Sequence, residues 1–145
     1  MTGGGLFLPK RCEQEMLEHC HQRYPKEACG ILAGNNVGPW DLWREVVHVY
    51  PMRNVEDSPI GYSMDPNEQL LVEKQMRQRG QGMVGIYHSH TASAAYPSSV
   101  DVSLAISPEV SYVLVSLKDR QRPELKSYRI DGARVSEEPV VVEGA

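Results

Sequence analysis

Three strand-like segments follow one another at the end of this chain, and this order constrains its fold more than any other feature. The segments Tyr112 to Leu117, Leu125 to Ile130 and Val135 to Val142 carry β-branched and aromatic residues. Asp131-Gly132, between the last two segments, is a dipeptide typical of a hairpin turn. Because the helical patterns all come earlier in the chain, we predict an α+β fold rather than a doubly wound α/β sheet.

Three segments have helical patterns. The segment Arg11 to Arg23 places apolar residues at helical spacing. A second helix is predicted from Asp65, which can cap it ahead of a proline, to a point near Gly80. A third helix is predicted over Ser99 to Ile106.

Earlier strands are also predicted. The segments concerned are Ala28 to Ala33, Leu42 to Tyr50, Tyr62 to Met64 and Met83 to Tyr87. The first two are expected to form a hairpin across a turn at Asn35 to Pro39. Pro51 to Gly61 is expected to be a loop, so the predicted sheet is interrupted before the second helix.

Length and composition indicate one ordinary globular domain over residues 1–145, with 41% hydrophobic and 23% charged residues. A net charge of -4 without a basic tract argues against nucleic acid as a partner, although a basic patch formed only in the fold stays open. No apolar run is long enough to span a membrane, and Met1 to Lys10 lacks the pattern of a secretory signal. We therefore expect a cytoplasmic protein. Three cysteines without a CxxC pair predict no disulfide framework.

A metal site is indicated where the strand Met83 to Tyr87 ends. His88 and His90 alternate with one residue between them, so a strand would direct both imidazoles to one face. Asp101 follows on the next predicted helix and offers a carboxylate. Two histidines and one carboxylate are a typical catalytic zinc set, with a fourth position open for water. The ligand types alone also permit iron, cobalt or manganese.

Hydrolysis needs a proton carrier and a donor to the oxyanion. Glu27, just before the apolar strand, is the candidate for the first role, and Ser98 for the second. Each residue has a simpler interpretation: Glu27 as a solvated loop acid, Ser98 as a helix cap, and Asp101 as an acid favoured in the first turn of a helix. The functional hypothesis depends on the joint pattern. Cys29 is interpreted as a core residue, with a role near the site left open.

The joint pattern resembles the JAMM, or MPN-plus, metalloprotease family. That family has an upstream glutamate, then HxH, seven residues, a serine, two residues and an aspartate. The corresponding residues are Glu27, His88, His90, Ser98 and Asp101. The flanking segments Glu27 to Leu32 and Gly85 to Tyr87 are also similar to the family's, and the resemblance extends from about Arg11 to Val142.

This resemblance implies a curved, mixed β-sheet flanked by helices, an architecture similar to that of cytidine deaminases. It also implies that His88, His90 and Asp101 hold one Zn²⁺ ion with a bound water, that Glu27 is the general acid/base and that Ser98 is the oxyanion donor. Some members of the fold lack the ligands and serve as non-catalytic interaction modules. Because all five motif residues are present here, an enzyme is the favoured interpretation.

Within the family, the chain looks most like bacterial Mec-type enzymes. These hydrolyse the bond between a cysteine and the C-terminal glycine of CysO, a small ubiquitin-like sulfur-carrier protein ending in Gly-Gly. The resemblance implies a role in cysteine biosynthesis. The alternative is a general JAMM peptidase or isopeptidase acting on ubiquitin-like protein tails. A Gly-Gly tail is narrow, and the Pro51 to Met64 region is expected to form one wall of the slot that admits it.

Overall fold

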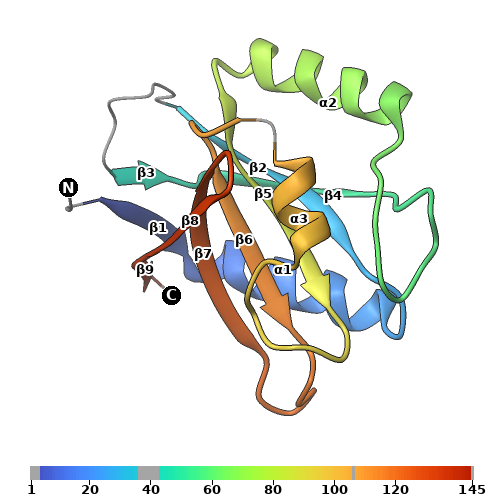
Figure 1. Cartoon of the computed structure of the whole chain (residues 1–145). Helices are drawn as coiled ribbons and strands as arrows, with labels where there is room; N and C mark the ends of the chain where they lie inside the picture. The colour runs from blue at the N-terminus through green and yellow to red at the C-terminus, as the bar shows by residue number, and fades with distance from the viewer. Residues whose placement is uncertain (1–3, 36–42, 106, 145) are drawn as a thin grey trace.

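A computed structural model describes residues 4–35, 43–105 and 107–144 (Figure 1). Its elements in chain order are β1 (Gly5–Pro9), α1 (Lys10–Arg23), β2 (Cys29–Gly34), β3 (Trp43–Glu45), β4 (His48–Met52), α2 (Pro66–Gln78), β5 (Gly82–His90), α3 (Ser99–Leu104), β6 (Ser111–Ser116), β7 (Glu124–Asp131), β8 (Arg134–Glu138) and β9 (Val140–Glu143).

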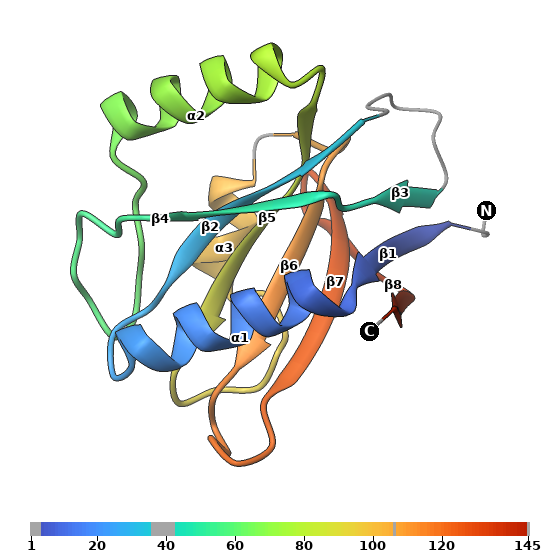
Figure 2. The same cartoon turned by 180° about the vertical axis from the view of Figure 1, so that it is seen from behind.

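The main sheet has six strands in the order β4-β2-β5-β6-β7-β8. Only β5 and β6 run parallel in it, and the other neighbours are antiparallel. A second sheet has three parallel strands in the order β3-β1-β9. Figures 1 and 2 show α1 and α3 on opposite sides of the main sheet. The prediction of an α+β fold with a mixed sheet flanked by helices is therefore confirmed.

The two faces of the main sheet follow from the alternation of side chains along β2. Leu32 packs in the cluster that includes Met16 of α1, whereas Ile31 packs in the cluster that includes Val72 of α2. A third cluster joins α3 to β6 and β7, with Leu114 among its buried residues. Neighbouring Val113 belongs to the α1 cluster, so α2 and α3 share the face opposite α1.

Gly30 of β2 leaves room for the ring of Tyr87 on β5. A Cβ at Gly30 would lie 2.1 Å from the ring of Tyr87, its partner across the β2–β5 ladder. Tyr87 is fully buried, and its hydroxyl lies 2.7 Å from Nδ1 of His19 on α1. The ring of Tyr87 therefore occupies the space that a larger residue at position 30 would need, and Tyr87 directly precedes His88.

The three predicted helices are present. The side chain of Asp65 accepts a hydrogen bond from the Asn67 N–H and caps α2, as expected. Helix α3 is shorter than predicted because it ends at Leu104, and Ile106 lies outside the described residues. Among the described residues, no helix is long and apolar enough to cross a membrane. The three cysteines are buried and unpaired, in agreement with the prediction of no disulfide framework.

Two predicted strands are each divided between the two sheets. The prediction of one strand over Leu42 to Tyr50 is wrong, because Val46 donates its N–H to Phe7 of β1 while Val47 donates to Ala33 of β2. The chain thus changes sheets between β3 and β4, and only β4 forms the expected pairing with β2. Leu42 itself lies outside the described residues.

The prediction of one strand over Val135 to Val142 is also wrong. Pro139 has no N–H for the β8 ladder, and its carbonyl accepts a hydrogen bond from Leu6 at the start of the β1–β9 pairing. The predicted turn between β7 and β8 is present, with Gly132 at φ +62°.

Two further parts of the structure differ from the prediction, and one predicted turn cannot be compared with it. The strand β1 was not predicted, because the segment is only five residues long and follows a glycine-rich start. Tyr62 to Met64 forms an isolated bridge from Met64 to Asn54 instead of a strand, and β4 extends two residues into the predicted loop. Most of the turn predicted over Asn35 to Pro39 lies outside the described residues.

Candidate functional site

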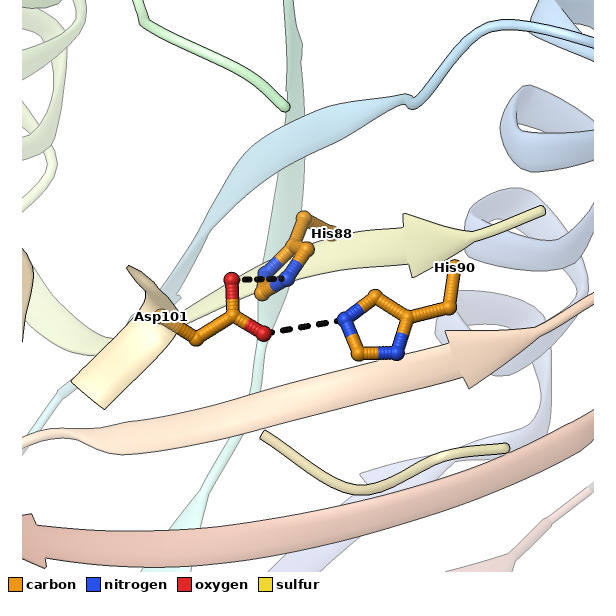
Figure 3. A group of neighbouring side chains, drawn as sticks. All are labelled: His88, His90 and Asp101. Atoms are coloured by element: carbon orange, nitrogen blue, oxygen red, sulfur yellow. Dashed lines mark hydrogen bonds and ion pairs between the residues drawn. The ribbon is translucent and has the colours of Figure 1, made fainter. Parts of the chain in front are cut away.

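The end of β5 and the start of α3 bring three potential ligands together. His88 and His90 lie on one face of β5, and Asp101 lies in the first turn of α3. Asp101 Oδ1 is 3.1 Å from His88 Nε2, and Asp101 Oδ2 is 2.9 Å from His90 Nε2. Figure 3 shows the carboxylate facing both imidazoles, with one oxygen toward each ring. One potential ligand atom of each residue lies within 4.8 Å of the other two.

The environment of both imidazoles fits a metal ion. His90 Nδ1 is 2.9 Å from the carbonyl oxygen of Ala94 and donates its proton there, which leaves Nε2 as the ring nitrogen that faces Asp101. His88 Nε2 is buried, and among the described residues it has no hydrogen-bond partner of good geometry despite its distance to Asp101. A buried nitrogen without such a partner is costly, and a bound cation would remove that cost.

The electrostatics of the three residues differ because their burial differs. Complete burial lowers the pKa of His88. Burial also opposes a charge on His90, but hydrogen bonds with Asp101 and Ala94 raise its pKa overall. Burial acts against the charge of Asp101, yet its close contacts with the two imidazoles keep the pKa of the carboxyl well below its usual range. The site therefore holds an ionised carboxylate beside a neutral His88.

Glu27 lies beside this group, two residues before Cys29, the first residue of β2. It is 6% exposed, which is inconsistent with a solvated loop acid. Burial raises its pKa to about 7, and the charges of Asp101 and Glu56 add to the rise while His90 opposes it. Glu27, His90, Ser98 and Asp101 all line one cavity of about 410 Å³. The carboxyl group is therefore able to accept or release a proton near neutral pH.

Ser98 is the N-cap of α3. Its Oγ accepts the N–H of Asp101 at 3.1 Å, and Asp101 Oδ2 accepts the N–H of Ser98 at 2.9 Å. The simpler interpretation of Ser98 as a helix cap is thus correct. The cap uses Oγ only as an acceptor, so the hydroxyl proton stays available for donation, and Ser98 is exposed at the edge of the cavity.

A second cavity of about 250 Å³ shares Asp101 with the first and has a mainly apolar lining. Its lining includes Tyr62, Met64, Ile86, His88, Asp101, Leu104, Tyr112, Leu114 and Ile130. Tyr62 stacks on His88 with ring centroids 4.5 Å apart and an interplanar angle of 28°. The site thus has a polar cavity containing Glu27 and an apolar cavity against His88.

Some participants were not identified from the sequence. The carbonyl of Ala94 orients His90, and the ring of Tyr62 supports His88, but a backbone oxygen and a loop tyrosine have no recognisable spacing. Cys29 is fully buried in the α2 cluster, and burial raises the pKa of its thiol to about 12. Its interpretation as a core residue agrees with this environment.

The remaining histidines lie outside this group. His19 bonds with Tyr87, His21 lies 3.0 Å from the carbonyl oxygen of Arg120, and His48 contacts Tyr50 with the two rings tilted at 54°. His21 is exposed, whereas His19 is partly buried and contacts Tyr87.

The family model of prokaryotic homologues of the JAB domain, Prok-JAB, matches residues 9–131. The chain belongs to this family. The resemblance to JAMM proteins is thereby confirmed. The chain is 49% identical over 127 residues to the CysO-cysteine peptidase of Mycobacterium tuberculosis, and the match covers 88% of this chain and 84% of that protein. It is also 31% identical over 121 residues to the desampylase of Haloferax volcanii, covering 80% of this chain and 84% of that protein.

A solved structure agrees with these sequence matches. The solution structure of a protein from Desulfitobacterium hafniense superposes on this Prok-JAB chain with a TM-score of 0.86 and 42% identity, covering 97% of this chain and 94% of the other. With relatives that are named peptidases, this Prok-JAB chain is an enzyme, a hydrolase of the JAMM type. The alternative of a non-catalytic interaction module is therefore set aside.

Proposed function

We propose that the chain is a zinc-dependent hydrolase that releases cysteine from the C-terminal glycine of a ubiquitin-like sulfur-carrier protein. The observation that carries this proposal is the convergence of two imidazole nitrogens and a carboxylate beside a buried glutamate in one cavity. The 49% identity to a CysO-cysteine peptidase supports the substrate. Residues 1–145 would act as one catalytic domain in the cytoplasm, within cysteine biosynthesis.

The metal would be held by Nε2 of His88, Nε2 of His90 and the carboxylate of Asp101. This donor set suits zinc. The protonated Nδ1 of His90 agrees with it, as does Nε2 of His88, which has no hydrogen bond of good geometry within the described part of the chain. When bound, one zinc ion would act as a Lewis acid and lower the pKa of a coordinated water to about 7.

Glu27 would move the protons of the reaction. Its carboxylate takes a proton from the attacking water and then donates it to the nitrogen of the leaving cysteine. A pKa of about 7 suits both steps, because the group is neither too weak a base nor too weak an acid at neutral pH. The cavity that contains Glu27 would therefore receive the leaving group.

Ser98 would stabilise the negative charge that forms on the carbonyl oxygen of the terminal glycine. The capping bonds with Asp101 fix the position of Oγ without using its proton. A donor fixed before the reaction stabilises the transition state without a reorganisation cost.

The protein partner would be a small ubiquitin-like carrier with a Gly-Gly C-terminus. Two glycines have no side chains, so the tail can reach ligands that are almost buried, with His88 and His90 each 5% exposed. The loop between β4 and α2 contributes Pro59 and Ile60 to the polar cavity and Tyr62 to the apolar one. This loop would form a wall of the tail slot.

The proposal is tested with the cysteine adduct of a purified carrier ending in Gly-Gly. We expect mass spectrometry to show free cysteine and intact carrier, a chelator to abolish the reaction, and zinc to restore it more fully than iron, cobalt or manganese. Folded Glu27→Gln protein is the matched control and should release no cysteine above background. Chelator-insensitive release, or release by Glu27→Gln at the normal rate, would contradict the proposal.

A second candidate is a general peptidase or isopeptidase for ubiquitin-like tails. The 31% identity to a desampylase favours it. The two candidates share all site residues, so they differ only in the leaving group. Carrier fusions with lysine, alanine or a peptide after the Gly-Gly tail distinguish them: comparable kcat/KM for all fusions favours the general peptidase, and a strong preference for cysteine favours the first proposal.

A further inference from the structure

The backbone of Glu27 is held entirely by the loop between β4 and α2. Glu27 precedes β2, so its N–H and C=O have no partners in the ladder. The N–H donates to Ser58 at 2.8 Å, and the C=O accepts the side-chain amide of Asn54 at 3.0 Å. Because buried backbone groups need partners, this loop determines where Glu27 lies.

Asn54 is the most deeply buried residue of loop 53–63, at 4% exposure. Its Nδ2 donates to the carbonyls of Glu27 and Gly61, each at 3.0 Å. Its Oδ1 accepts the N–H groups of Glu56 and Ser63, each at 3.0 Å. All four hydrogen-bonding positions of the amide are therefore used, which also fixes the assignment of oxygen and nitrogen.

The same loop is attached to the metal-binding strand. Thr91, the residue after His90, donates its hydroxyl to the carbonyl of Pro59 at 3.0 Å. Pro59 and Ile60 line the cavity that contains Glu27. The loop thus contacts both Glu27, the general acid/base candidate, and the residue that follows β5. The buried side chain of Asn54 holds the loop together by its hydrogen bonds within it.

We propose that Asn54 is a positioning residue, which holds Glu27 at the correct place relative to His90 and Asp101. This inference rests on the proposed function, since it assumes that Glu27 moves the protons. Asn54 acts through the backbone of Glu27 and through the shape of the loop, and it does not contact the reacting atoms. Displacement of a catalytic group by about 1 Å can reduce the rate about 10²-fold.

The test compares Asn54→Ala and Asn54→Asp with the wild type, using the carrier–cysteine adduct. Aspartate keeps an acceptor for the Glu56 and Ser63 N–H groups but offers no donor to the Glu27 carbonyl. We expect kcat per folded molecule to fall about 10²-fold in both variants. KM should stay within about threefold, because Asn54 itself lines neither cavity. Metal content should stay at the wild-type level.

The matched control is Asp57→Asn in the same loop. Asp57 forms exposed ion pairs with Lys26 and Arg23 and has a φ of +50°, which asparagine tolerates well. Exposed ion pairs contribute little, so kcat should change by less than about twofold.

Wild-type kcat in Asn54→Asp would overturn the inference, because the donor to Glu27 would then be dispensable. Thermal destabilisation of Asn54→Ala with unchanged kcat per folded molecule would also overturn it, since that is the result of a purely structural role. Failure of the proposed function is distinguishable: Glu27→Gln would then retain activity, whereas failure of this inference alone leaves Glu27→Gln inactive and both Asn54 variants active.

Discussion

Ser98 and Asp101 cap α3 by two reciprocal hydrogen bonds, one from each backbone N–H to the other side chain, at 3.1 and 2.9 Å. Asp101 Oδ2 accepts from Ser98 and also lies 2.9 Å from His90 Nε2. The cap therefore aims the carboxylate at the histidines. A local feature that starts a helix also assembles the candidate metal site.

Replacement of Ser98 by alanine should have two separable effects. Loss of the cap should reduce the free energy of unfolding by about 0.5–2 kcal/mol. Loss of the oxyanion donor should reduce kcat by about 10²–10³-fold. Chemical denaturation and steady-state kinetics measure the two effects, and Ser98→Thr, which keeps a hydroxyl, is the control. An unchanged kcat in Ser98→Ala would restrict the residue to capping.

Replacement of Asp101 by asparagine should prevent stable metal binding. Loss of an outer contact to a metal ligand typically lowers affinity 10–100-fold, so loss of a charged ligand should lower zinc affinity by at least about 10²-fold. Zinc retained after dialysis, measured by atomic absorption, checks this. Glu137→Gln, at an exposed position on β8, removes the same charge and should retain zinc. Equal zinc content in both variants would exclude Asp101 as a ligand.

Glu27→Gln should stabilise the chelator-treated protein at alkaline pH. The pKa of Glu27 is about 7 in the fold against an ordinary value of 4.5, because burial penalises the charged form. The folded state binds the proton more tightly, so stability falls as the pH rises from about 4.5 to 7. At pH 8 the buried charge should cost roughly 1–3 kcal/mol, which glutamine avoids.

Thermal unfolding of both proteins at pH 4 and pH 8 measures this difference. The stabilisation by glutamine should be present at pH 8 and much smaller at pH 4, where Glu27 is mostly protonated in both states. A constant difference across this range would show that the effect does not come from the charge of Glu27.

Gly30→Ala should destabilise the fold, because the new methyl group would lie 2.1 Å from the buried ring of Tyr87. Overpacking of this kind typically costs about 1–3 kcal/mol. Urea denaturation measures the cost. In a Tyr87→Leu background the ring is absent, so the additional cost of Gly30→Ala should become much smaller. If Gly30→Ala costs the same free energy of unfolding in both backgrounds, the destabilisation does not come from a clash with the ring of Tyr87.

Much of the fold was predictable from local patterns. The alternation of His88 and His90 places both rings on one face of any strand, and Asp65 followed by proline predicts the start of α2. The sequence also indicated the candidate ligands, since residue types and spacing carry that signal. What it could not provide was the partner of each strand. The chain passes from one sheet to the other near Val46 and near Pro139, and the hydrogen bonds to Phe7, Ala33 and Leu6 that show this come from distant parts of the chain.

The sequence by itself determined which side chains are available for metal binding and proton transfer, because these depend on residue identity and on short-range geometry. Only the tertiary structure decided their environment. Burial in the fold raises the pKa of Glu27, and the side chain of Asn54 reaches its backbone from 27 residues further along the chain. Such long-range contacts set the dielectric environment and the distances within the site, and no local pattern encodes them.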